Sequence, residues 1–293
     1  MTWMGKVNAG IISVFLTLAL SVFVSQAWCA GRELHSKNSK AISLYEDGLV
    51  LAEKEQFDQA LEKLKAAIDT DPGFLEAHLR YMDAFRSVGR GEEVASMYKN
   101  MLAKNSDSPL YNFLYGRTLS DMAEKRAAFR KALSLDPDFY YAQYGIGGSF
   151  MIEGRMDEAI VALNKTLEMK PDMQDALRLL GSIYMDKGMP LQARNVLEQA
   201  LAQDSTDAML LQGLGQAYSQ LEKYESAEKV FRKGAALHPD DPIFLYFIGL
   251  VCEMSGRPAE AEASFDKFLK VAPDDELAPV VTKMVERLKK KTN

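Results

Sequence analysis

Residues 140–173 read YYAQYGIGGSFMIEGRMDEAIVALNKTLEMKPDM, and this stretch decides the fold. Apolar and small residues recur at helical spacing over residues 140–153, and Gly154 then predicts a turn. Asp157 predicts the start of a second helix. Pro171 predicts its end, because proline lacks the backbone donor that a continuing helix needs. The stretch therefore predicts a hairpin of two helices.

The hairpin recurs along the chain. One set of glycines marks it: Gly48, Gly116, Gly147, Gly181, Gly215 and Gly249. Gly116 follows Gly48 by twice 34 residues, and the later glycines follow one another at intervals of 31, 34, 34 and 34 residues. A second set keeps the same register: Ala60, Val94, Ala159, Ala193, Ala227 and Ala261. Two sets that share one period indicate an internal repeat.

Gly147 falls in the middle of a predicted helix, where glycine costs about 1 kcal/mol relative to alanine. We interpret this glycine as a packing device. It would face Ala159 on the second helix, so that the two backbones approach and Ile146, Phe150 and Leu163 interlock. The third unit is three residues short, and there Asp121 and Glu124 have the spacing of a capping box.

These positions resemble the tetratricopeptide repeat family over residues 41–275. The fourth and sixth units carry the resemblance most fully, with Gly147, Phe150, Ala159, Leu163 and Pro171, and with Leu214, Gly215, Tyr218, Ala227, Phe231 and Pro239. The resemblance implies an all-α, helical-hairpin repeat solenoid wound into a right-handed superhelix. We expect seven units and a capping helix, with the bounds 41–74, 75–108, 109–139, 140–173, 174–207, 208–241, 242–275 and, for the cap and basic tail, 276–293.

The N-terminus predicts export. Residues 11–24 are apolar apart from small hydroxyl residues, which is typical of a secretory signal. Small residues favour cleavage after Ala27, which gives a signal peptide over 1–27 and a linker over 28–40. Two alternatives remain open: a retained anchor over 7–31, which would bring the chain into contact with a membrane, and lipidation of Cys29. Each predicts an exported chain, either periplasmic or anchored and facing the periplasm or exterior.

Composition excludes several classes of function. The formal net charge is −6 and the basic residues are scattered, so nucleic acid is not an expected partner. Cys29 and Cys252 cannot form a zinc cage, and His35, His78 and His238 lack partners at i+3 or i+4. No metal or cofactor is predicted, and no enzyme is predicted, because no phosphate loop, zinc-protease motif or serine elbow occurs.

The predicted binding groove lies opposite the packed glycine face of each first helix. Helical spacing places residues three before and one after each repeat glycine on this inner face. Its selected members are Tyr45, Phe113, Arg117, Tyr144, Gly148, Arg178, Gln212, Gln216 and Tyr246, and Tyr141 and Met151 extend the face in the fourth unit. Aromatic and arginine side chains favour contact with an extended peptide or a partner helix. Packing of the aromatics on neighbouring helices is the alternative.

We therefore expect a non-catalytic scaffold or adaptor that binds a protein or peptide partner in this groove. With the export signal, this suggests assembly of a secretion, pilus, outer-membrane or polysaccharide-export complex. The alternative is a periplasmic holdase that keeps client chains unfolded, and a third class is an accessory subunit of a membrane-bound transferase. Self-association through exposed repeat edges also remains open.

Overall fold

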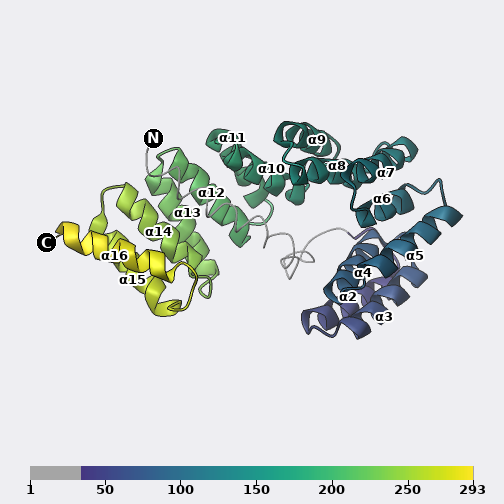
Figure 1. Ribbon diagram of the computed structural model, residues 1–293, viewed down its shortest axis with the longest axis horizontal. Coiled ribbons are helices and arrows are strands. Elements are labelled where there is room, and N and C mark those ends of the chain that lie inside the picture. The colour runs from purple at the N-terminus through teal and green to yellow at the C-terminus, as the bar shows by residue number, and fades with distance from the viewer. Residues whose placement is uncertain (1–33, 293) are drawn as a thin grey trace. The chain divides into compact units, whose positions relative to one another are not determined.

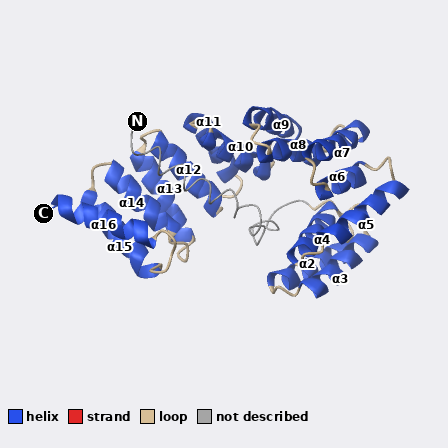
Figure 2. Cartoon of the chain, in the orientation of Figure 1, coloured by secondary structure: helices blue, strands red, loops and turns tan. Residues whose placement is uncertain are grey.

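The computed structural model describes residues 34–292, so the predicted signal peptide, its alternatives and Cys29 lie outside the described residues. Every regular element in the described part is an α-helix, fifteen in all (Figure 2). None of these helices combines the length and the apolar character that a membrane crossing requires. These helices form where apolar side chains recur at helical spacing, as the sequence predicts.

The chain forms two compact units, which meet in sequence between Thr118 and Leu119. Unit 1 contains five helices (Figure 1): α2 (Ser39–Glu53), α3 (Phe57–Thr70), α4 (Leu75–Ser87), α5 (Gly91–Lys104) and α6 (Pro109–Thr118). Unit 2 contains ten helices: α7 (Met122–Leu135), α8 (Tyr140–Ile152), α9 (Met156–Met169), α10 (Gln174–Asp186), α11 (Pro190–Leu201), α12 (Ala208–Gln220), α13 (Tyr224–Leu237), α14 (Ile243–Met254), α15 (Pro258–Val271) and α16 (Ala278–Thr292).

Each of the seven predicted repeats contains one helix pair, from α2 and α3 to α14 and α15. The boundary between the units falls inside the third repeat, between α6 and α7. This is the repeat that is three residues short. Asp121 caps α7, since its side chain accepts a hydrogen bond of 2.8 Å from the backbone N–H of Glu124. This hydrogen bond confirms the Asp121 half of the predicted capping box.

The turn inside most pairs needs one residue in the left-handed backbone region. Gly154 has a φ of 73°, and the following N–H, of Arg155, donates to the carbonyl of Phe150 at 2.9 Å. Glu55 and Glu222 adopt the same conformation with φ of 58° and 57°. A side chain makes this conformation costly, and glycine is the residue that adopts it readily.

The repeat glycines make room for a large side chain of the second helix. A Cβ added to Gly147 would lie 2.8 Å from Leu163, and Ala159 is not among its nearest atoms. The pairing recurs in other repeats, where Gly215 lies against Phe231 and Gly249 against Phe265. The expected interlocking of Leu163 at this glycine is confirmed, and the expectation that Gly147 faces Ala159 stays a prediction. The residue four positions after the alanine fills the space, because its longer side chain reaches across to the glycine.

The last helix closes the C-terminal end of the core. Val281, Val285 and Leu288 on α16 are buried against a cluster that contains Phe265 and Phe268 of α15. Arg287 adds an ion pair with Glu253 of α14 at 2.7 Å. Without this helix the apolar face of the seventh repeat would meet water, which repeat proteins avoid with a capping element.

Candidate protein-interaction surface

The first helices of the fourth, fifth and sixth repeats form one continuous surface within unit 2. Helix α10 contacts both α8 and α12, so the three helices lie in a row. Their faces opposite the glycine–leucine and glycine–phenylalanine contacts make up what we call the inner surface. We define it by the predicted residues that the structure leaves partly exposed on these helices: Tyr141, Tyr144, Gly148, Met151, Arg178, Gln212 and Gln216.

The α8 end of the inner surface is aromatic and apolar. Tyr141, Tyr144 and Met151 are half-buried and pack against the same buried cluster, which contains Leu163 of α9 and Leu180 of α10. Tyr140 and Tyr141 stack with their ring centroids 4.4 Å apart. The core thus holds the inner ends of these side chains in place and leaves their outer ends accessible. Space remains beside them, because a Cβ built on Gly148 would have no atom of another helix within 4 Å.

Arg178, in the middle of the surface, is an internal ion-pair partner. Its guanidinium donates to the carboxylate of Asp175 and lies 3.6 Å from that of Asp207. Asp207 also caps α12 by accepting from the N–H of Leu210 at 3.0 Å. Both carboxylates are nearly buried, so the positive charge of Arg178 is largely neutralised. Arg178 therefore ties α10 to the start of α12.

The α12 end of the inner surface is polar and uncharged. Gln212 and Gln216 are half-buried on successive turns of the helix. A glutamine amide both donates and accepts hydrogen bonds, which suits the N–H and C=O groups of an extended peptide. The inner surface thus runs from aromatic and apolar side chains to amides.

Three predicted groove residues are in the core. Tyr45, Phe113 and Tyr246 are 2%, 2% and 5% exposed. Tyr45 packs on Phe74 with centroids 4.9 Å apart, and Tyr246 lies 6.3 Å from Phe268. The prediction that they face a ligand does not hold in this structure, and the alternative of packing on neighbouring helices applies to them. Helical spacing gave their direction, but large neighbouring side chains cover that side.

Arg117 and the remaining unit 1 residues are not part of the inner surface. The guanidinium carbon of Arg117 lies 5.9 Å from the ring centroid of Phe113, within α6 of unit 1. The structure therefore brings together the seven predicted residues on α8, α10 and α12.

Sequence reasoning missed two methionines that share this register. Met185 follows Met151 by 34 residues and is half-buried on α10. Met209 precedes Gln212 by three residues, as Tyr141 precedes Tyr144, and is 52% exposed on α12. The repeat period would have found both. Methionine is flexible and polarizable, so it adapts to differently shaped apolar partners.

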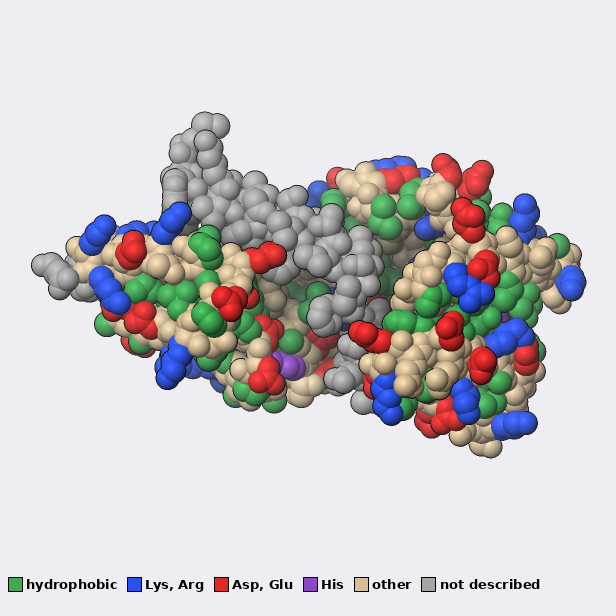
Figure 3. Space-filling view, turned by 60° about the horizontal axis from the view of Figure 1, so that its bottom comes forward, with side chains coloured by type: hydrophobic (Ala, Val, Ile, Leu, Met, Phe, Trp, Pro, Cys, Tyr) green, Lys and Arg blue, Asp and Glu red, His purple; other side chains and the backbone are tan. Residues whose placement is uncertain are grey.

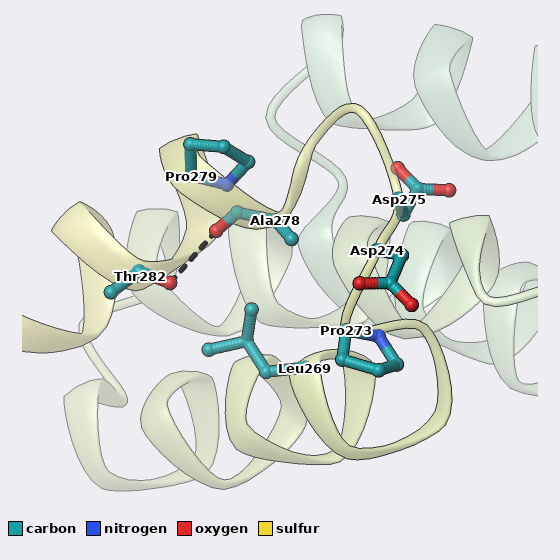
Figure 4. A pocket seen from close by; sticks show the side chains of 7 residues that line it. All are labelled: Leu269, Pro273, Asp274, Asp275, Ala278, Pro279 and Thr282. Carbon is teal, nitrogen blue, oxygen red and sulfur yellow. Dashed lines mark hydrogen bonds between the residues drawn. The ribbon is translucent and has the colours of Figure 1, made fainter.

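A pocket of about 480 Å³ lies between the end of α15 and the start of α16 (Figure 4). Its polar groups serve the chain's own turns. Thr282 donates to the carbonyl of Ala278 at 2.8 Å, and Asp275 accepts from the N–H of Leu277 at 2.8 Å. The lining has no nucleophile beside a general base, so this pocket does not suggest catalysis.

A second cluster gathers three groups that can ligate metals. Ligand atoms of Glu228, Cys252 and Glu260 lie within 4.8 Å of one another. Arg257 donates to both carboxylates, at 3.2 Å to Glu260, and Arg232 donates to Glu228. Burial raises the pKa of the Cys252 thiol, which opposes the thiolate that a metal needs. This cluster is therefore an arginine-centred ion-pair network between α13, α14 and α15.

Charges of both signs are mixed on the part of the chain that the structure describes. On the face drawn in Figure 3, acidic and basic side chains of the described residues are interspersed. The sequence pI is about 5.3. Strong phosphate binding requires a concentrated basic face.

Solved structures share the fold. The tetratricopeptide repeat protein YrrB, described as having an unusual peptide-binding site, is 21% identical, with a TM-score of 0.57 over 64% of this chain and 99% of YrrB. Yeast Tom70 is 17% identical, with a TM-score of 0.58 over 86% of this chain and 54% of Tom70. MamA is 24% identical, with a TM-score of 0.51 over 62% of this chain and 93% of MamA.

No curated protein matches the sequence. Models of one family, described as tetratricopeptide repeat, match residues 51–118, 125–176, 175–207 and 213–276. These ranges span α3–α6 and nearly every helix of unit 2. The matched ranges agree with the glycine register and the paired helices. The chain therefore belongs to the tetratricopeptide repeat family, a family of protein-interaction scaffolds.

Proposed function

We propose that the inner surface of unit 2 binds an apolar segment of a partner protein. The observation that carries this proposal is the row of half-buried side chains from Tyr141 and Tyr144 on α8 to Gln212 and Gln216 on α12. Aromatic side chains bury much area with few rotatable bonds, and the amides can bond the peptide backbone. The partner segment is apolar because the central cation, Arg178, is already paired with two carboxylates.

We further propose that the protein is a non-catalytic assembly scaffold of the cell envelope. The apolar stretch over residues 11–24, with small residues before Trp28, supports export. The mass of the mature protein from its native source tests this part. A start at Trp28 or an acylated Cys29 supports export, whereas an intact chain recovered from the cytosol contradicts it.

Variants of the full-length chain test the binding surface. Tyr144→Ala combined with Gln212→Ala and Gln216→Ala is expected to lower recovery of crosslinked partners at least tenfold. A matched control, Gln192→Ala with Gln203→Ala, removes the same amides from exposed positions of α11 and the turn after it. If the two sets of variants recover equal amounts of crosslinked partner, with their circular dichroism unchanged, the proposal is overturned.

The range of partners separates a scaffold from a holdase. A scaffold retains one or two folded proteins. A holdase instead binds many unfolded chains and suppresses their aggregation in a light-scattering assay.

A further inference from the structure

A second surface lies on the outer side of unit 2, away from the inner surface. The second helices α7 and α9 form the walls of a groove of about 580 Å³, and α8 forms its floor. This volume is within the range of about 300–1,000 Å³ typical of ligand sites. Ile146 and Phe150 provide the floor, Leu133 lies on the α7 side, and Val161 lies on the α9 side.

The floor of the groove is held rigidly. Two guanidinium groups lie over the ring of Phe150, that of Arg126 at 4.6 Å and that of Arg155 at 4.5 Å from the ring centroid. Both arginines are themselves held by the carboxylate of Glu153. The apolar floor is therefore formed before any ligand arrives, which lowers the entropic cost of binding.

Val161 marks the groove as different from the other repeats. Its side chain is 71% exposed, the largest exposure among the large apolar residues of the described chain. Residues at the same place, two after the repeat alanine or Val94, are polar or small: Glu62, Ser96, Asn195, Lys229 and Ala263. The fold therefore does not require an apolar residue here. An exposed valine beside an apolar floor is typical of a contact site.

The charges in the groove indicate what it binds. The two acids at its edge are already paired, Asp157 with Lys187 at 2.8 Å and Glu158 with Arg155 at 2.6 Å. Arg130 of α7 and Lys165 of α9 are exposed and form no ion pair with any residue from 34 to 292. The groove thus offers apolar contacts together with two uncompensated positive charges.

We infer that this outer groove binds a protein segment that carries apolar side chains next to a carboxylate. The apolar side chains contact Val161 and Ile146, and the carboxylate lies between Arg130 and Lys165. This site is independent of the inner surface, so a scaffold of this kind can hold two partners at once.

Selection with defined peptides tests the inference. A phage library of random 12-residue peptides is selected against the full-length protein and counter-selected against Val161→Asn, which introduces the residue found at Asn195. The enriched peptides are expected to combine apolar residues with Asp or Glu. A synthetic peptide from this set is expected to bind Val161→Asn at least tenfold more weakly by fluorescence anisotropy.

Charge reversal provides the second readout. Lys165→Glu is expected to weaken the acidic peptide at least tenfold, and a peptide with its acids replaced by lysine should recover that affinity. Lys229→Asn, at the register position of Val161 but in α13, and Tyr144→Ala, on the inner surface, should leave peptide binding unchanged. If Tyr144→Ala instead abolishes peptide binding, the peptide is assigned to the inner surface and the outer site is overturned.

Three other outcomes also overturn the inference. They are an empty selection, enriched peptides without acidic residues, and peptides that bind Val161→Asn as tightly as wild type. A dimer seen by sedimentation velocity that Val161→Asn abolishes would assign the groove to a second copy of this chain. Since Val161 is exposed, its substitution is expected to leave the melting temperature unchanged. Lys165→Glu is a second variant that tests the same groove independently of Val161.

Discussion

The guanidinium of Arg126 lies 4.6 Å from the ring centroid of Phe150, and this contact fastens α7 to α8. Arg126 is almost completely buried and also reaches Glu153 at 2.9 Å and Ser149 at 3.4 Å. Helix α7 is the first helix of unit 2. Arg126 therefore adds a cation–π contact and an ion pair to the packing of Phe129 against Gly145, which also joins α7 to α8.

Arg126→Ala is expected to lower the free energy of unfolding by about 2 kcal/mol, because it removes a buried cation–π contact and the packing of the arginine stem. Urea denaturation followed by circular dichroism measures the change. Hydrogen exchange should show the amides of α7 losing protection first. Arg130→Ala, on the exposed side of the same helix, serves as the control. Equal effects of the two substitutions would contradict the role assigned to Arg126.

Gly215→Ala is expected to destabilise the protein by about 2 kcal/mol, because the new Cβ would lie 2.3 Å from the Phe231 ring. Gly148→Ala is the matched control, since nothing lies within 4 Å of the added Cβ. Alanine should stabilise α8 there by about 1 kcal/mol. Thermal unfolding of both variants measures the two changes, a loss of stability in Gly215→Ala and a gain in Gly148→Ala. A second change, Phe231→Leu, should relieve part of the strain in Gly215→Ala.

Glu222→Gly is expected to raise the free energy of unfolding by about 1 kcal/mol, because Glu222 adopts a left-handed conformation with a φ of 57°. Glu222→Ala retains that cost and removes only the side chain, so it should have little effect. Chemical denaturation compares the two. If alanine stabilises as much as glycine, the backbone explanation is wrong.

Stability is expected to fall in mild acid because of His78. Burial lowers the pKa of His78 below its ordinary value of 6.5, although a hydrogen bond to the Pro72 carbonyl at 3.0 Å opposes the shift. The unfolded chain therefore binds a proton more readily than the folded chain. The contribution of neutral His78 to the free energy of unfolding is complete above pH 6.5. It is lost as the pH falls below 6.5 toward the lowered pKa of the folded state.

The His78 ring also forms a hydrogen bond with the Tyr98 hydroxyl at 2.9 Å. His78→Gln is the test of this pH dependence, because an amide can still bond this hydroxyl and the Pro72 carbonyl without taking up a proton. Free energies of unfolding measured at about pH 7.5 and about pH 5.5 should differ less in the variant than in the wild type. Identical pH dependence of the two proteins would show that other groups are responsible.

The helices and turns were largely predictable because each rests on local rules. Gly154 ends one helix and Pro171 follows the next at the positions that the sequence predicts. The binding residues were predictable only in part. Helical spacing gives the direction of a side chain from its own helix, and Tyr144 and Tyr246 share that direction. Tyr144 remains partly exposed, whereas Phe265 and Phe268 of α15 surround Tyr246.

The outer groove could not be predicted for a related reason. Val161 reads as one more apolar residue of an amphipathic helix. Polar residues at its position in other repeats mark a surface position, and its 71% exposure shows that it faces outward. Likewise, Arg178 reads as a free cation until the carboxylates of Asp175 and Asp207 are placed beside it.

By itself the sequence determined that this protein is a chain of helical hairpins repeating every 34 residues, because periodicity, glycine placement and proline stops act within one repeat. The tertiary structure alone decided which repeated positions are surface and which are core. Burial depends on the size of side chains that neighbouring repeats contribute. It also decided which charges are already paired, and so left Arg130 and Lys165 as the cations of the outer groove.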